Sequence, residues 1–290
     1  MAYLAGALRV VAVVLAIVAL PALARSDDNA TPPVACELTT DVAVDLATSP
    51  ISTPAPEPPE VAPIDPRVAA GEHWRLETTR GPVHVWVPPD YNAATAATVV
   101  FVHGYNTDVD TMWTGALLPE QFARSGVNAM FIACEAPYGK LAPMVWPSLD
   151  GLLASVAAGT GKRMPHGRLV TIGHSGAYRT IVLWLANRAL STVVLLDGAY
   201  GELDRFAEWV RVSRNHRFIN IAYETQSYSD FMHQAMPGTF RVDGLPETDF
   251  EADARAARVL YVRTDVGHWP LVTGGVAIPA ALRALGVPRG

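Results

Sequence analysis

From about residue 71 to its end, the chain alternates between short apolar segments rich in β-branched residues and longer segments with helical periodicity. The apolar segments lie at 98–102, 127–133, 168–172, 192–196, 217–222 and 258–263. The helical segments lie at 111–125, 148–158, 176–189, 202–214 and 272–286. Continuously apolar strands that alternate with helices are typical of parallel sheets buried on both faces. The pattern therefore predicts an α/β fold with a mostly parallel, doubly wound sheet flanked by helices.

An antiparallel hairpin is expected before these strands. The segments "HWRLETTR" (73–80) and "PVHVWVP" (82–88) flank Gly81, and both alternate in character as strands do. In the second segment the alternation places His84 and Trp86 on one face. The three valines at 83, 85 and 87 then lie on the other face.

The N-terminal region has the composition of an export signal followed by a linker. Residues 10–20 are an apolar run that follows Arg9 and precedes Pro21, and the small residues Ala22 and Ala24 occupy the positions that a signal peptidase requires. The run is too short for a membrane span, so we expect residues 1–24 to be removed and the remainder to be exported without a stable span, to the periplasm, cell surface or medium. Residues 25–70 are rich in Pro, Ala, Thr and acidic residues, which predicts a disordered linker. The catalytic domain would then cover residues 71–290.

The composition also narrows the partners and the cofactors. The net charge is −6, the pI is about 5.7, and there is no basic run, which argues against nucleic acid and favours a small-molecule or acylated substrate. Two cysteines, Cys36 and Cys134, are far apart in the sequence, and no H-E-x-x-H motif is present, so no metal site is expected. The two cysteines either pair in an oxidising compartment or leave Cys134 as a buried free thiol. No cofactor is implied, and the sequence leaves the oligomeric state open.

A serine within a short segment that contains two glycines follows the apolar segment 168–172. The segment Gly173-His174-Ser175-Gly176-Ala177 is close to the G-x-S-x-G motif, in which a serine sits on a sharp turn from a strand into a helix. Ala177 departs from the motif, but it is small enough for such a turn. Ser175 is therefore the candidate nucleophile.

Two further polar residues follow other strands of the predicted sheet. Asp197 comes directly after 192–196, and His268 comes a few residues after 258–263. Parallel strands end at one edge of a sheet, which is where ligands bind, so both residues are expected beside Ser175. A serine hydroxyl needs a base, and the base needs an orienting carboxylate. Glu224, after 217–222, is an alternative carboxylate, but Asp197 is preferred because it follows its strand at once and precedes a glycine that permits the turn.

Acyl transfer to a serine also needs donors for the developing oxyanion. After the segment 98–102, His103 and Gly104 turn the chain and direct the backbone N–H of Tyr105 toward the expected site. The backbone N–H of Gly176 would be the second donor. His103 is expected to brace this loop, and His174 to form a wall of the site or the start of the helix.

Four short segments resemble the α/β-hydrolase superfamily: "FVHGYN" (101–106), "GHSGA" (173–177), "LLDG" (195–198) and "DVGHW" (265–269). The resemblance covers about residues 70–290. It implies the α/β-hydrolase fold, Ser175 as nucleophile, His268 as general base and acid, and the N–H groups of Tyr105 and Gly176 as oxyanion donors. In many members the acid follows the next strand, which here would be Glu224. Because this fold carries many activities, the resemblance does not identify the substrate.

Two long excursions, 135–147 and 224–256, leave strands on the expected active edge and are predicted to act as lids. The second contains apolar side chains that would suit an acyl or aromatic group: Tyr228, Phe231, Met232, Met236 and Phe240. The intact set of site residues favours an exported serine hydrolase that cleaves an ester, and less readily an amide, through an acyl-enzyme. The alternative is a catalytically silent binding protein of the cell envelope with the same fold.

Overall fold

The computed structural model describes residues 65–287 and 289. The predicted signal peptide, Cys36 and most of the predicted linker lie outside the described residues. Within the linker range 25–70, Pro66–Ala70 forms a short helix, α1, which Asp65 caps by accepting a hydrogen bond from the Arg67 N–H at 2.8 Å. Val68 of this helix packs against the core, so the described part of the domain begins before residue 71.

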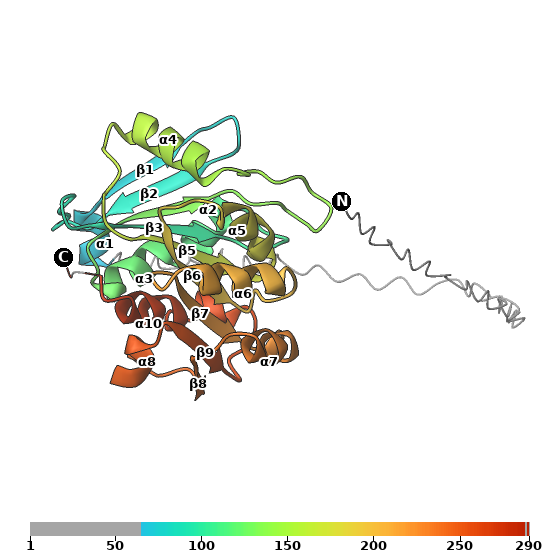
Figure 1. Ribbon diagram of the computed structural model, residues 1–290. Helices are drawn as coiled ribbons and strands as arrows, with labels where there is room; N and C mark the ends of the chain where they lie inside the picture. The colour runs from blue at the N-terminus through green and yellow to red at the C-terminus, as the bar shows by residue number, and fades with distance from the viewer. Residues whose placement is uncertain (1–64, 288, 290) are drawn as a thin grey trace, which may run out of the picture. The chain divides into compact units, whose positions relative to one another are not determined.

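The centre of the domain is a sheet of nine strands within the described residues (Figure 1). The strands are β1 (Glu72–Leu76), β2 (Val83–Val87), β3 (Ala97–Val102), β4 (Ala129–Cys134), β5 (Leu169–His174), β6 (Leu190–Leu196), β7 (Arg217–Ala222), β8 (Thr239–Asp243) and β9 (Val259–Arg263). Their order across the sheet is β1-β2-β4-β3-β5-β6-β7-β9-β8. Strand β2 is antiparallel to β1 and β4, and every other neighbouring pair is parallel. The predicted α/β class with a mostly parallel sheet is confirmed.

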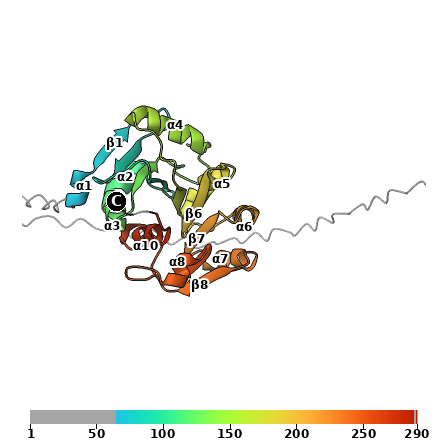
Figure 2. The ribbon, with the colours of Figure 1, turned by 60° about the vertical axis from the view of Figure 1, so that its left-hand side comes forward.

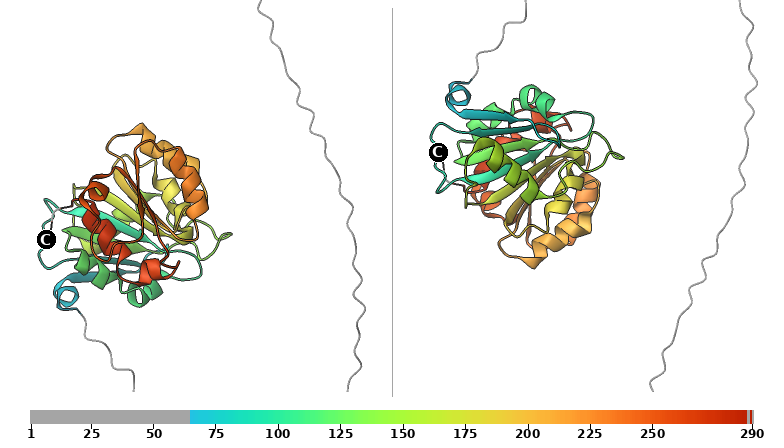
Figure 3. Two further views of the ribbon diagram at one scale, coloured as in Figure 1. Left: turned by 90° about the horizontal axis from the view of Figure 1, so that it is seen from below. Right: turned by 90° about the horizontal axis from the view of Figure 1, so that it is seen from above.

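Helices cover both faces of this sheet (Figures 2 and 3). One core cluster contains side chains of α2 (Val109–Gly115), α3 (Leu118–Ser125), α8 (Ala252–Ala256), α9 (Pro270–Thr273) and α10 (Ala277–Ala284). The other contains side chains of α4 (Leu149–Thr160), α5 (Tyr178–Trp184), α6 (Leu203–Val212) and α7 (Gln226–Gln234). Because the central strands are apolar on both faces, each face requires such a layer.

The predicted alternation in β2 is confirmed. Trp86 packs in the cluster under α2 and α3, where its ring is 5.7 Å from that of Phe131, and His84 bonds Asp110 of α2 at 2.7 Å. The valines at 83, 85 and 87 pack in the cluster on the opposite face. Strand β2 is therefore buried on both sides and joins the hairpin firmly to the parallel sheet.

The excursion 224–256, predicted as a loop, contains α7, β8 and α8. Met232 and Met236 are core residues beneath α7, whereas Tyr228 and Phe231 are exposed on the same helix. Met232 lies within α7, and Met236 lies in the turn that follows the helix. The predicted apolar lining is therefore divided between the core and the surface, and the excursion mainly extends the sheet by one edge strand.

Cys134 lies at the end of β4, where its thiol is fully buried and forms no disulfide with a described residue. Burial raises the pKa of this thiol, so it stays protonated and unreactive. Among residues 65–287 and 289, no helix has both the length and the apolar character needed to cross a membrane.

Candidate active site

Ser175 directly follows β5, which ends at His174, two residues later than the sequence predicts. Ser175 has a φ of 54°, a strained value for a residue with a side chain, and it opens a 3₁₀ turn that leads into α5. Gly173 is required beneath this turn, because a Cβ there would lie 2.4 Å from Ile181 Cδ1 and 3.1 Å from Ala177 Cβ. Ala177 occupies the last position of the G-x-S-x-G motif, and its methyl group fits at this turn beside Gly173.

Asp197 and His268 are brought together at the same edge of the sheet. Asp197 directly follows β6, and its Oδ2 lies 2.6 Å from Nδ1 of His268, which follows β9. The Asp197 side chain is fully buried and also accepts hydrogen bonds from the backbone N–H groups of Tyr223, Glu224 and Thr225 and from the Thr225 hydroxyl. Burial alone would raise the pKa of Asp197, but hydrogen bonds from His268, Thr225 and Tyr223 outweigh it and hold that pKa far below its usual range. Asp197 is therefore an ionised acceptor that fixes the His268 ring.

Glu224 lies beyond hydrogen-bond distance of His268. Its Oε2 is 3.9 Å from His268 Nδ1, its side chain is 54% exposed, and it accepts a hydrogen bond from the Tyr200 hydroxyl at 2.9 Å. Asp197, and not Glu224, therefore makes the hydrogen bond that orients the His268 ring.

The same three side chains, Asp197, Glu224 and His268, are close enough to be considered as metal ligands, with their ligand atoms within 4.8 Å of one another. The oxygens of Asp197, however, already accept five hydrogen bonds. Each carboxylate oxygen has about two lone-pair sites, so little capacity remains for an ion. The donor set fits a histidine–carboxylate pair better than a metal centre.

The loop after β3 lies directly against the serine turn. A Cβ on Gly104 would be 2.8 Å from Ser175 Cβ, and a Cβ on Gly176 would be 2.4 Å from the ring of Tyr105. The Tyr105 hydroxyl accepts a hydrogen bond from Arg179 of α5 at 3.2 Å. The backbone N–H of Tyr105 donates to no other described residue, so this N–H is available to a ligand.

Two histidines that the sequence does not place in the chemistry brace these loops. The ring of His103 contacts the Gly104 carbonyl at 2.7 Å, the Ala136 N–H at 2.9 Å and the Glu135 carboxylate at 2.9 Å, so it links the loops that follow β3 and β4. His174 reaches the backbone carbonyl of His268 at 3.0 Å. Sequence reasoning missed this second contact because residues 174 and 268 are 94 positions apart.

Two other residues around the pair are missing from the sequence predictions. Thr225 supplies two of the hydrogen bonds to Asp197, and Tyr200 holds Glu224. Thr225 follows the end of β7 by three residues, so its place after a parallel strand is the only sequence signal that could have identified it. Tyr200 has no such signal.

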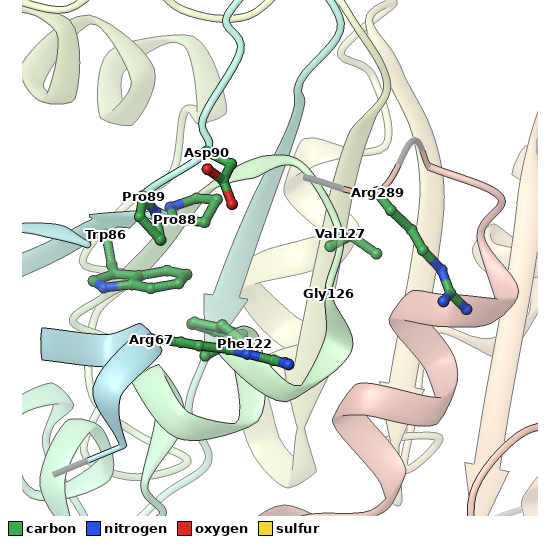
Figure 4. Close-up of a pocket in the computed structure, with 10 residues that line it drawn as sticks. Arg67, Trp86, Pro88, Pro89, Asp90, Phe122, Gly126, Val127 and Arg289 are labelled. Atoms are coloured by element: carbon green, nitrogen blue, oxygen red, sulfur yellow. The ribbon is translucent and has the colours of Figure 1, made fainter. Parts of the chain in front are cut away.

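The described residues also form a partly open cavity of about 330 Å³ at the opposite edge of the sheet (Figure 4). Residues that follow β2 or precede β4 line it, and Arg67 and Arg289 approach it from the two ends of the described chain. Its lining residues are Arg67, Trp86, Pro88, Pro89, Asp90, Phe122, Ala123, Gly126, Val127 and Arg289. None of the candidate catalytic side chains contributes, so this cavity is separate from the candidate active site.

No protein-family model and no curated protein matches the sequence. Among solved structures, an S-formylglutathione hydrolase from Agrobacterium tumefaciens is similar at a TM-score of 0.50 and 9% identity, over 75% of this chain and 96% of that chain. A feruloyl esterase module from Clostridium thermocellum has a TM-score of 0.47 and 15% identity, over 74% of this chain and 87% of that chain. A dienelactone hydrolase from Anabaena variabilis has a TM-score of 0.46 and 11% identity, over 76% of this chain and 100% of that chain. The likeness to the S-formylglutathione hydrolase shows that this chain has the α/β-hydrolase fold.

Proposed function

We propose that the protein is an exported serine hydrolase that cleaves an ester bond, and less readily an amide bond, through an acyl-enzyme. The observation that supports it most strongly is the 2.6 Å hydrogen bond between Asp197 and His268 at the sheet edge where Ser175 begins its turn. The likeness in fold to an S-formylglutathione hydrolase is consistent with this activity. Export is proposed from the sequence of residues 1–24 alone.

In the first half-reaction, the Ser175 hydroxyl attacks the ester carbonyl while its proton passes to Nε2 of His268. Nδ1 of His268 keeps its proton in the hydrogen bond to Asp197, whose negative charge stabilises the imidazolium that forms. The alcohol then leaves with the proton from Nε2, and the acyl group remains on Ser175. In the second half-reaction, water loses a proton to Nε2 and attacks the acyl carbon, which releases the carboxylic acid and restores Ser175.

The tetrahedral intermediates carry a negative oxygen that needs donors. We assign this role to the backbone N–H groups of Tyr105 and Gly176, because the Tyr105 loop lies against the serine turn and its N–H donates to no other described residue. One such donor contributes about 3–4 kcal/mol to the stability of the transition state in a related serine enzyme reaction. The contact between Tyr105 and Gly176 keeps the two donors on neighbouring segments.

The substrate class is inferred from side chains that surround this edge. Tyr138 and Leu141 follow β4 and are 65% and 97% exposed, and Trp269 follows His268 and is 44% exposed. Apolar side chains gathered at an active edge favour a substrate with an apolar acyl or aromatic part. Long-chain and aromatic esters are therefore expected to react faster than acetate esters, and equal turnover of the two would contradict this preference.

The proposed mechanism is tested with a fluorophosphonate, which forms a covalent adduct only with an activated serine. The purified chain is exposed to the probe, and its intact mass is measured beside Ser175→Ala and His268→Ala. Ser227→Ala, at an exposed serine in the first turn of α7, is the matched control. We expect one adduct on the parent chain and on the control, and none on the other two variants. A folded parent chain without an adduct would overturn the hydrolase and leave the silent binding protein.

A further inference from the structure

A second histidine lies within the candidate active site without a part in the proposed reaction. His174 is the last residue of β5, next to Ser175, and its side chain is 0% exposed. Its Nε2 lies 3.0 Å from the backbone carbonyl oxygen of His268, and the centres of the two imidazole rings are 4.5 Å apart. This contact joins the strand that carries the nucleophile to the loop that carries the base.

The contact determines the protonation of His174. A carbonyl oxygen only accepts hydrogen bonds, so Nε2 of His174 must carry the proton. Nδ1 is buried without a hydrogen-bond partner among the described residues, on the side where Gly104 approaches. Burial, and then the nearby His268, lower the pKa of His174 to about 4. At neutral pH the ring is therefore an uncharged donor with a single tautomer.

We propose, on the basis of the function proposed above, that His174 is a positioning residue whose hydrogen bond to the His268 carbonyl sets the backbone of the histidine loop. His268 is then held at two points: Asp197 binds its ring, and His174 binds its main chain. With both in place, the ring and the main chain of His268 are fixed relative to β5, whose end leads into Ser175. Because the His174 ring is uncharged, it does not repel the positive charge of the imidazolium that forms on His268 during acyl transfer.

The alternative is that His174 only fills space beneath the loop, and side-chain replacement separates the two roles. His174→Gln retains an N–H at the same number of bonds from the backbone, whereas His174→Leu keeps most of the volume and removes the donor. His174→Phe, a ring without a donor, replaces the leucine variant if that variant does not fold. His233→Leu is the matched control, because His233 is another buried histidine whose pKa burial lowers to about 4 and which contacts Asn220 and Thr239, away from the site.

The first readout does not require turnover. The proton on His268 Nδ1, hydrogen-bonded to Asp197, should give a low-field proton NMR signal that Asp197→Asn removes. We expect this signal to persist in His174→Gln and in the His233→Leu control, and to broaden or vanish in His174→Leu. A signal that persists in both folded His174 variants, or is lost in both, overturns the positioning role.

The second readout is the rate of fluorophosphonate labelling. We expect a decrease of at least tenfold in His174→Leu, recovery to within about threefold of the parent in His174→Gln, and the parent rate in the control. Equal rates in the two His174 variants would contradict the proposal. A parent chain that is not labelled, but shows the expected NMR pattern, would reject the hydrolase and leave the positioning contact supported.

Discussion

At the scale of single residues, the central question is which carboxylate orients His268. Asp197 is buried and bonds the ring at 2.6 Å, while Glu224 is exposed and lies 3.9 Å away. We expect Asp197→Asn to lower kcat about 10⁴-fold, because the amide cannot stabilise the imidazolium and favours the wrong tautomer. Glu224→Gln should lower kcat less than tenfold. Kinetics with an aryl ester measure both.

Folding must be monitored in this comparison, because Asp197 also accepts four hydrogen bonds from residues 223–225. Thermal unfolding of each variant separates lost stability from lost catalysis. Thr225→Val is a useful companion, because it removes one hydroxyl donor to Asp197 and leaves the histidine contact in place. If Glu224→Gln proved the more damaging of the two carboxylate changes, the assignment of Asp197 would be wrong.

At the scale of elements, the site depends on contact between the loop after β3 and the turn after β5. The Tyr105 ring lies on Gly176 so closely that a Cβ would be 2.4 Å from it. Gly176→Ala should therefore displace the Tyr105 loop and one proposed oxyanion donor, with a fall in kcat of about 10²- to 10³-fold. Adding Tyr105→Ala makes room for the new methyl group, so the double variant should recover much of that loss. The same steady-state assay measures it, and a double variant no faster than Gly176→Ala would contradict the steric explanation.

Sequence patterns identify the elements whose burial is strong and continuous. The central strands β3 to β7 and β9 are mostly apolar and mostly buried, and each was predicted within a few residues of its observed range. Strand β8 was missed, because it lies at the edge with most of its side chains exposed and shows no apolar run. The predicted helix 111–125 is two helices, because Leu117 adopts a φ of 49° and Pro119, the second residue of the next helix, has no N–H to continue the first one.

The candidate site also contains some residues that the sequence predicts and others that it does not. Ser175, Asp197 and His268 were predicted from topology, since each follows a parallel strand and such strands end at one edge. The support from His174, Tyr200 and Thr225 could not be predicted, because those contacts depend on side-chain directions between segments that are distant in sequence.

At the scale of the whole molecule, the two helical layers bury several titratable side chains as well as the apolar core. Three buried histidines have pKa values lowered from the ordinary value of 6.5, with burial as the largest cause in each: His84, His174 and His233. Such a group binds its proton more readily in the unfolded chain than in the folded one. Stability due to these residues is therefore complete above pH 6.5 and is lost as the pH falls below it.

His233 gives the clearest test of this dependence. It is buried between β7 and β8, where Nε2 accepts a hydrogen bond from Asn220 and Nδ1 contacts the Thr239 hydroxyl, so a proton added at Nε2 would face another donor. The pKa of His233 in the folded chain is about 4. The free energy of unfolding of the parent should therefore fall by about 2 kcal/mol through His233 as the pH is lowered from 6.5 to 5. His233→Gln should lower stability at pH 7, yet lose about 2 kcal/mol less than the parent when the pH is lowered to 5.

Urea unfolding at pH 7 and pH 5 measures this difference, with His166→Gln, a change at an exposed histidine, as the matched control. The control should follow the parent at both pH values, because its ring is not enclosed by the two layers. The quantity compared is the change in unfolding free energy between the two pH values, so the packing defect of each variant cancels to first order. A parent and a His233→Gln variant that lose the same free energy would show that His233 takes up its proton in the folded chain as readily as in the unfolded one, and that burial does not lower its pKa.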